Sequence, residues 1–215
     1  MIQRQRERER ESKQPIALSL GVSTYSPWDL EMAQKGYLVL QYDGSIEKSP
    51  DSYKNIIFHK KFVGTKNDSK TISLEQILQD YNLDVNAHNI LQMDIEGAEW
   101  DIFEKLDFAL LEKYFAQIIV EFHWIDPRNR FQSIRYLAIL EKFASAFQVI
   151  HLHYVTCASY YYTNQFFAGQ IEVSYARKDL LPKDFSLRSV CGDIEGLDYP
   201  NDPNGQYFNI SIDFT

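Results

Sequence analysis

The chain has 215 residues, a formal net charge of −8, 24% charged residues and 45% hydrophobic residues. This length suits one globular domain rather than two, and 14 Tyr, 14 Phe and 3 Trp residues exclude a disordered, low-complexity or collagen-like body. The longest apolar runs are strand-sized and the start of the chain is charged, so we expect no membrane helix, no secretory signal and a cytoplasmic location. The two cysteines, Cys157 and Cys191, are too few for a disulfide scaffold and are expected to be reduced.

Charge is distributed unevenly along the chain. Residues 1–13 carry five basic and three acidic side chains, a net charge of +2, which leaves −10 for the remainder. A body this acidic repels nucleic acid and anionic membranes, so neither is expected as a partner. We therefore divide the chain into a charged N-terminal extension, residues 1–14, and one folded domain, residues 15–215. The extension is either a solvated end or a contact to a partner, for example the second subunit of a homodimer.

Short apolar runs alternate with amphipathic stretches in the first half of the domain, which is typical of a parallel sheet with helices on its faces. A first strand over residues 16–21 ends at Gly21. Ser26 and Pro27 then predict the start of a helix that runs to about residue 36, because serine favours the N-cap and proline the first helical position. The next expected elements are strands at residues 37–42 and 55–63, a helix at 73–81 and a strand at 89–93.

The second half continues the alternation with a helix over residues 98–114, broken near Asp107, and a strand over 117–122. A helix over 131–147 follows, because five apolar residues recur at helical spacing. These are Phe131, Ile134, Leu137, Leu140 and Phe147. The last two strands, 149–155 and 170–175, are too close in sequence for a connecting helix, so we expect a hairpin with an antiparallel last strand. The predicted fold is a Rossmann-like α/β sheet, mostly parallel, with helices on both faces.

Ligands of such sheets bind at the carboxyl ends of the strands, where Gly21 and Asp43 follow the first two strands. A glycine lets the backbone approach a cofactor closely, and an acidic side chain can accept both hydroxyls of a ribose. A dinucleotide also needs a glycine-rich turn around its pyrophosphate, and the segment Gly21-Val-Ser-Thr-Tyr-Ser26 has one glycine. S-adenosylmethionine has no phosphate, so the sequence favours this cofactor over NAD or FAD.

The most specific local pattern is an acidic strand-to-helix turn, Asp94-Ile-Glu-Gly-Ala-Glu99. Acidic side chains are favoured at a helix start, where they accept hydrogen bonds from free backbone amides. One hypothesis is therefore that Glu96 and Glu99 only cap the turn. The other is that Asp94 and Glu96 face the positively charged sulfonium or the acceptor.

At this turn the chain resembles the FkbM-type family of S-adenosylmethionine-dependent methyltransferases, whose signature is close to K-[MIL]-D-[IV]-E-G-[AS]-E. Gln92 stands where the family usually has lysine. Four further segments are similar to family motifs and occur in the family's order: Leu20-Gly-Val22, Tyr42-Asp43, Val120-Glu-Phe-His123 and Ile171-Glu-Val-Ser-Tyr175. Two features depart from the family: Ser23-Thr-Tyr-Ser26 replaces its glycine-rich or acidic continuation, and a charged tail replaces the segment before the first strand.

The resemblance implies a class I methyltransferase domain that transfers a methyl group from S-adenosylmethionine to an oxygen, often on a sugar or natural product. Gly21, Val22, Asp43 and Gly44, together with Asp94 and Glu96, are the cofactor-binding positions that it implies. A hydroxyl acceptor also needs a proton acceptor. His123, just after the fifth strand, is the first candidate, with Asp94 or Glu121 second. The alternative is a structural histidine bonded to a neighbouring carboxylate.

Two alternatives stay open at the sequence level. Asp94, Glu121 and His123 could bind a divalent metal that holds a sugar hydroxyl, although we favour no metal; His151 and His153 are expected to lie too far away to join it. The chain could also be a methyltransferase-like binding or assembly subunit without activity. The aromatic loop 157–167 and Trp124–Arg128 suit a carbohydrate or other small-molecule acceptor, because tyrosine rings stack on sugars, but a packed aromatic cluster is an equally good explanation.

Overall fold

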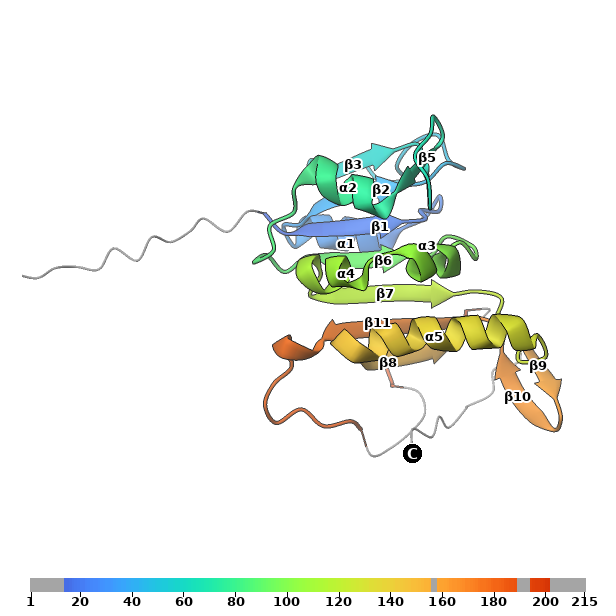
Figure 1. The fold of residues 1–215 in the computed structure, drawn as a ribbon. Helices are drawn as coiled ribbons and strands as arrows, with labels where there is room; N and C mark the ends of the chain where they lie inside the picture. Colours follow the sequence, from blue (N-terminus) through green and yellow to red (C-terminus); the bar gives the residue numbers. More distant parts are fainter. Residues whose placement is uncertain (1–13, 156–157, 189–193, 202–215) are drawn as a thin grey trace, which may run out of the picture.

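The computed structural model describes residues 14–155, 158–188 and 194–201 of the chain. A seven-stranded sheet runs through the molecule in the order β3-β2-β1-β6-β7-β11-β8 (Figure 1). Its strands are β1 (Ile16–Leu20), β2 (Leu38–Tyr42), β3 (Ile56–His59), β6 (Ile90–Met93), β7 (Gln117–Phe122), β8 (Phe147–Tyr154) and β11 (Ile171–Arg177). β11 is antiparallel to both its neighbours, and the other pairs in this sheet are parallel. The predicted fold class, including the antiparallel last strand, is confirmed.

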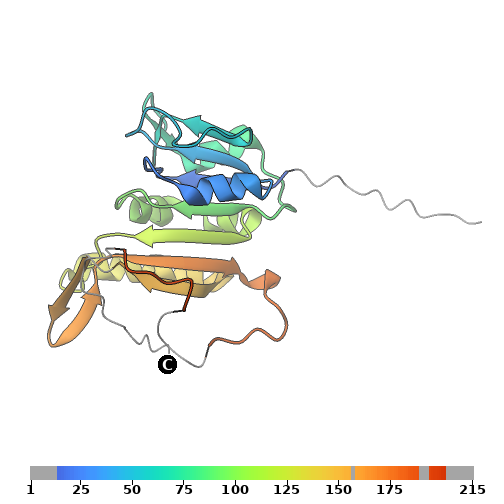
Figure 2. The same ribbon diagram turned by 180° about the vertical axis from the view of Figure 1, so that it is seen from behind.

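Helices cover both faces of the sheet, but unequally. They are α1 (Pro27–Gln34), α2 (Leu74–Tyr81), α3 (Glu99–Lys105), α4 (Phe108–Tyr114) and α5 (Arg130–Ala146). Helices α2 to α5 lie on one face, and α1 lies on the other, as the opposite view in Figure 2 shows. The larger core therefore lies under α2 to α5 around Trp100, Phe103 and Phe143, and a smaller one lies under α1 around Met32 and Ala33.

The expected break near Asp107 is confirmed, and its cause is visible. Asp107 is the N-cap of α4, and its Oδ1 accepts a hydrogen bond of 3.0 Å from the backbone N–H of Ala109. A side chain that satisfies a free N–H in this way starts a new helix and separates it from the one before. Ser73 caps α2 in the same manner through the N–H of Gln76.

The single strand expected over residues 55–63 is wrong, because the chain turns at Lys60 and Lys61. The N–H of Lys61 donates to the carbonyl of His59, which ends β3. The apolar run then resumes as β4 (Phe62–Gly64), which pairs with β5 (Thr71–Ser73) in a separate two-stranded sheet. Two consecutive lysines are poor candidates for the interior of a sheet, so the strand stops where they begin.

The helix expected over residues 131–147 is confirmed as α5, but most of the apolar row that predicted it is not the buried one. Phe131, Ile134 and Leu137 are 89%, 59% and 59% exposed. The helix buries Tyr136, Ile139 and Phe143 instead, a second row with the same three-to-four spacing. Aromatic packing explains the choice: the ring of Tyr136 stacks on Trp100 with centroids 3.8 Å apart, and Phe143 contacts five aromatic rings of the core, those of Phe103, Phe108, Phe122, Phe147 and Tyr175.

Part of the aromatic loop expected over 157–167 is a small antiparallel hairpin of β9 (Ser159–Tyr162) and β10 (Gln165–Ala168). Thr163 and Asn164 form its turn, both with positive φ. The two cysteines, the charged tail and the alternating run at Tyr207–Phe214 lie outside the described residues. Within the part of the chain that the structure describes, no helix has both the length and the apolar character needed to cross a bilayer.

The observed orientation of α5 gives a prediction about stability. Phe143→Ala should lower the free energy of unfolding by about 3–5 kcal/mol, because it removes a buried aromatic side chain and leaves a cavity. Phe131→Ala on the same helix should change it by less than about 0.5 kcal/mol, because that ring is exposed. Urea denaturation of the two variants measures both values. Equal losses would contradict the orientation in which Phe143 is buried and Phe131 is exposed.

Candidate functional site

The register of the sheet places the ends of its central strands in one row. Leu20 lies opposite both Tyr42 and Met93, and Met93 lies opposite Val120. The next residues on these four strands are Gly21, Asp43, Asp94 and Glu121. The row continues across the sheet, because Glu121 lies opposite Glu172, which lies opposite His153. The residues that the sequence singled out after the strands therefore share one edge of the sheet.

Gly21 occupies a position that no other residue can take without rearrangement. Its φ is +83°, in the left-handed region, and a Cβ at this position would lie 1.6 Å from the carbonyl oxygen of Asp94. The backbone can pass this close to the end of β6 only where there is no side chain. Gly21 thus keeps the loop after β1 against the first residue of the acidic turn.

Asp43 is the centre of a set of hydrogen bonds at the end of β2. Its Oδ2 accepts from the N–H of Val22 at 2.9 Å, and its Oδ1 accepts from the N–H and hydroxyl of Ser45, both at 2.6 Å, and from the N–H of Ile46. Burial opposes its charge, but these hydrogen bonds outweigh burial and lower the pKa of Asp43. Oδ2 has one donor in these contacts, so it keeps acceptor capacity for a ligand.

A buried polar contact that the sequence analysis missed holds the other end of the loop after β1. Asp29 in α1 is buried, and its Oδ2 accepts from the amide of Gln41 at 2.6 Å and from the hydroxyl of Ser26 at 2.8 Å. Burial raises the pKa of Asp29. Ser26 is the N-cap position as predicted, but its hydroxyl contacts Asp29 rather than a backbone N–H. The contact ties the start of α1 to β2; a glutamine inside an apolar strand was the available signal.

Glu99 organises the acidic turn between β6 and α3. Its buried Oε1 accepts from the N–H groups of Ile95 and Gly97, each at 3.2 Å, and from Nδ1 of His123 at 2.8 Å. Glu99 therefore satisfies free amides of the turn, as the capping hypothesis expects, but it does not only cap, because it also holds His123. The hypothesis does not describe Glu96, whose side chain is exposed and whose φ is +58°. Gly97, also with positive φ, completes the bend.

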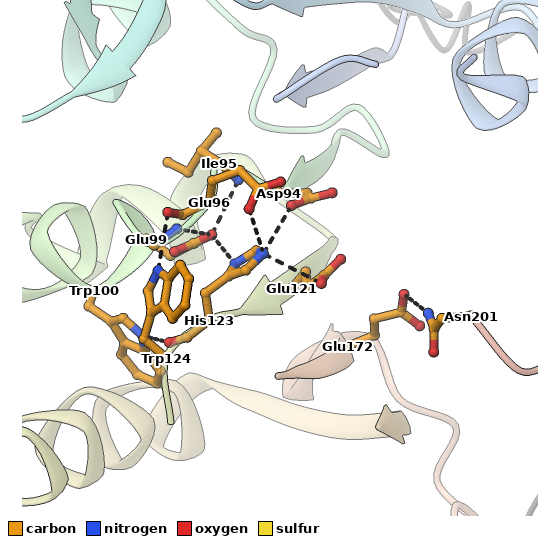
Figure 3. A network of polar contacts seen from close by, with 11 residues as sticks. Asp94, Ile95, Glu96, Glu99, Trp100, Glu121, His123, Trp124, Glu172 and Asn201 are labelled. Atoms are coloured by element: carbon orange, nitrogen blue, oxygen red, sulfur yellow. Dashed lines mark hydrogen bonds and ion pairs between the residues drawn. The ribbon is translucent and has the colours of Figure 1, made fainter. Parts of the chain in front are cut away.

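His123 lies at the centre of the candidate site and is 1% exposed. Because the carboxylate of Glu99 accepts from Nδ1, the ring is fixed and Nε2 faces the other acidic groups (Figure 3). Nε2 lies 3.6 Å from Asp94 Oδ1, 3.6 Å from Glu96 Oε2 and 3.4 Å from Glu121 Oε1. The structure thus brings together all three residues that the sequence analysis named for catalysis, and it adds Glu96 and Glu99 to them.

The mutual repulsion and burial of these groups shift their pKa values. Burial, together with the nearby carboxylates, raises the pKa of Asp94 to about 6 and that of Glu121 to about 7. Burial also opposes a charge on His123, but the hydrogen bond from Nδ1 to Glu99 and the surrounding carboxylates outweigh it and raise its pKa to about 9. The cluster has more negative groups than its one imidazole can neutralise.

Aromatic residues border the acidic turn and connect it to the β9–β10 hairpin. The indole N–H of Trp124 donates to the carbonyl of Glu96 at 3.3 Å, and the ring fills the space where a Cβ of Gly97 would lie. Tyr160 of the hairpin donates its hydroxyl to the carbonyl of Ile125 at 3.0 Å, and Arg128 lies over its ring. The two segments expected to form one binding surface are therefore in contact.

His151 and His153 bond to carboxylates other than those that face His123. Nδ1 of His153 bonds to Glu172 at 2.9 Å, and Nε2 of His151 bonds to Asp198 at 2.7 Å. Among the described residues, the group whose ligand atoms lie close enough to hold a metal ion consists of Asp94, Glu96 and His123, all within 4.8 Å of one another. The sequence analysis named Glu121 as the third member. It missed Glu96 because the left-handed backbone that turns this side chain toward His123 leaves no mark in the residue pattern.

Comparison with known proteins assigns the family. Residues 3–150 match the family model of the methyltransferase FkbM domain, and no curated protein matches the chain. A solved structure of a proposed S-adenosylmethionine dependent methyltransferase from Listeria monocytogenes is 12% identical over 77% of this chain and 92% of that one, with a TM-score of 0.43. A 16S rRNA (adenine(1408)-N(1))-methyltransferase from Catenulisporales acidiphilia, in mutant form, is 11% identical over 78% and 86%, with a TM-score of 0.40.

The family match covers more than half of the chain, including β1, β2, the acidic turn and the end of β7. It therefore includes the whole row of residues from Gly21 to His123 described above. The chain belongs to the FkbM methyltransferase family, and it is an S-adenosylmethionine-dependent methyltransferase.

Proposed function

We propose that this methyltransferase acts on a hydroxyl group of a sugar, a glycan precursor or a small natural product. The observation that carries the proposal is the orientation of His123. Glu99 holds Nδ1, and Nε2 faces the edge of the sheet at which β1 and β2, the strands before Gly21 and Asp43, also end. A base oriented by a second carboxylate is the arrangement that removes a proton from an alcohol.

The roles of the residues follow from their places in the row. Gly21, Val22, Asp43 and Gly44 surround the end of β2 and are proposed to bind the nucleoside part of the cofactor, with Asp43 on the ribose. Asp94 and Glu96 lie next to them and favour a positive charge by Coulomb attraction. When bound, S-adenosylmethionine supplies a methyl group on a cationic sulfur, which leaves as a neutral thioether when the acceptor oxygen takes the methyl.

The proton of the acceptor hydroxyl has a defined destination in this arrangement. As the carbon–oxygen bond forms, the proton passes to one of the two carboxylates beside His123, Asp94 and Glu121, or to Nε2 of His123 in the neutral form of the ring. Because transfer of a methyl group is an in-line displacement, the remaining work of the protein is alignment of donor and acceptor.

The surface around the cluster supports a carbohydrate or related small molecule as the acceptor. Trp124, Tyr161 and Tyr162 are exposed, and the β9–β10 hairpin that carries the tyrosines is fixed to the segment after β7. Exposed aromatic faces stack on sugar rings, and tyrosine hydroxyls bond to sugar hydroxyls. The acidic body of the chain, with −10 outside residues 1–13, opposes a nucleic acid acceptor.

The acceptor class can be tested with methyl-labelled S-adenosylmethionine and three pools: cellular saccharides, small metabolites and total RNA. We expect label in the saccharide or metabolite pool, on oxygen, detected by mass spectrometry. Heat-inactivated protein is the control. Label confined to RNA, or on nitrogen only, would contradict the proposal.

Asp43→Ala tests the cofactor half of the site. We expect the dissociation constant of S-adenosylmethionine to rise about 10- to 100-fold, because a hydrogen bond to a charged group contributes about 1.5–3 kcal/mol. Calorimetry measures the affinity. Asp68→Ala is the matched control, since Asp68 also accepts backbone N–H bonds within a loop, from Lys70 and Thr71. If both variants bind the cofactor as the parent does, Asp43 does not contact it.

His123→Ala tests the acceptor half. Turnover should fall at least about 100-fold, as expected when a group that handles the acceptor proton is removed, while cofactor affinity stays within about threefold. The rate of labelled product formation and calorimetry give the two values. His153→Ala, which removes another buried histidine bonded to a carboxylate, should keep its turnover. Unchanged turnover in His123→Ala would remove this residue from the mechanism.

A further inference from the structure

The geometry points to a divalent cation site formed by Asp94 Oδ1, Glu96 Oε2 and His123 Nε2. The role of the cation in methyl transfer rests on the proposed function, since it would hold the acceptor hydroxyl. The binding of the cation to the protein does not depend on the proposed function. The site joins the end of β6, the acidic turn and the end of β7 (Figure 3).

The separations between the atoms fit ligands of one cation better than they fit hydrogen bonds. Nε2 of His123 lies 3.6 Å from each of the two carboxylate oxygens, beyond the usual range of a hydrogen bond. Two ligands that each lie about 2.1 Å from a tetrahedral cation are about 3.4 Å apart, and neighbouring ligands of an octahedral cation are about 3.0 Å apart. Small side-chain movements therefore suffice to close the three atoms around an ion.

The carboxylate of Asp94 provides an independent observation, because one of its oxygens is buried beside His123 without a hydrogen-bond partner. His123 is 1% exposed, and its Nε2 makes no hydrogen bond within the described residues, although it faces three carboxylates. Asp94 Oδ1 is inaccessible to solvent and has no hydrogen-bond partner within those residues either. Buried polar atoms are rarely left in this state, and this oxygen lies 3.6 Å from Nε2 of His123.

The second nitrogen of the ring is held as it is in metal-binding histidines. Nδ1 contacts the buried carboxylate of Glu99 at 2.8 Å. A carboxylate in this position fixes the ring orientation and makes the other nitrogen a better metal ligand. His153 differs: its Nδ1 also contacts a glutamate, but its ring is not part of the group that Asp94 and Glu96 form.

The surrounding charge also favours a cation. Asp94, Glu96, Glu99 and Glu121 bring four carboxyl groups around one imidazole, and a divalent ion compensates their repulsion. One nitrogen and two carboxylate oxygens suit Mn²⁺ or Zn²⁺, and the remaining positions are left for water and the acceptor hydroxyl. A bound hydroxyl becomes more acidic, and its proton can pass to Glu121, which lies beside the three ligands. With the cation bound, His123 is a ligand, and Glu121, which the proposed function already names as a proton acceptor, takes the proton.

Manganese titration tests this inference without any acceptor or cofactor. The full chain is stripped with a chelator, and Mn²⁺ binding is followed by electron paramagnetic resonance. We expect saturation at one ion per chain, and at least a 10-fold loss of affinity in both His123→Ala and Glu96→Gln. Glu96 is exposed, so its variant should fold as the parent does. His153→Gln is the matched control and should bind Mn²⁺ normally.

Failure of this inference can be separated from failure of the proposed function. Absence of saturable binding for both Mn²⁺ and Zn²⁺, or equal affinity in parent and Glu96→Gln, overturns the cation site even if S-adenosylmethionine binds and turnover is normal. Stoichiometric Mn²⁺ binding that needs Glu96 and His123 supports the site, whether or not a saccharide proves to be the acceptor. Chelator-sensitive turnover, restored by Mn²⁺ in the parent, would then assign the ion to the reaction.

Discussion

The hydrogen bond between Glu99 and His123 connects the turn after β6 to the end of β7, and the candidate site depends on it. Both side chains are buried, and removing Glu99 would leave Nδ1 of His123 without a partner in the interior. The same carboxylate oxygen accepts two backbone N–H groups of the turn. One buried group therefore sets both the shape of the acidic turn and the direction of the imidazole. The direction in which Nε2 points is a consequence of the contact at Nδ1.

The two halves of the site are built by different means. Near β1 and β2 the site is formed mainly by backbone. Gly21 lets the loop after β1 approach the end of β6, and Asp43 accepts hydrogen bonds from the backbone N–H groups of Val22 and Ser45. Near β6 and β7 the site is formed by side chains, because the strand register places Glu121 beside the acidic turn and the ring of His123 lies between them. This division agrees with the proposed function, in which the backbone half recognises one constant cofactor and the side-chain half takes a proton from the acceptor.

Local patterns were reliable where one side chain decides a boundary and unreliable where two surfaces compete. Asp107 and Ser73 mark helix starts by capping them, and the sequence placed both. Helix α5 carries two apolar rows at the same spacing, and periodicity cannot choose between them. The rings of Trp100 and Phe103 decide which row is buried, because they contact Tyr136 and Phe143, and they come from a distant part of the chain.

The sequence by itself determined the α/β alternation, the antiparallel last strand, the family and the residues that follow each strand, because these depend on local spacing and on motifs in a fixed order. Tertiary structure alone decided which of those residues meet. Glu96 reaches His123 through a left-handed backbone, and Glu99 turns inward to bond Nδ1. Neither fact can be read from neighbouring residues, because each depends on the contact between two strand ends whose residues lie 24 or more positions apart.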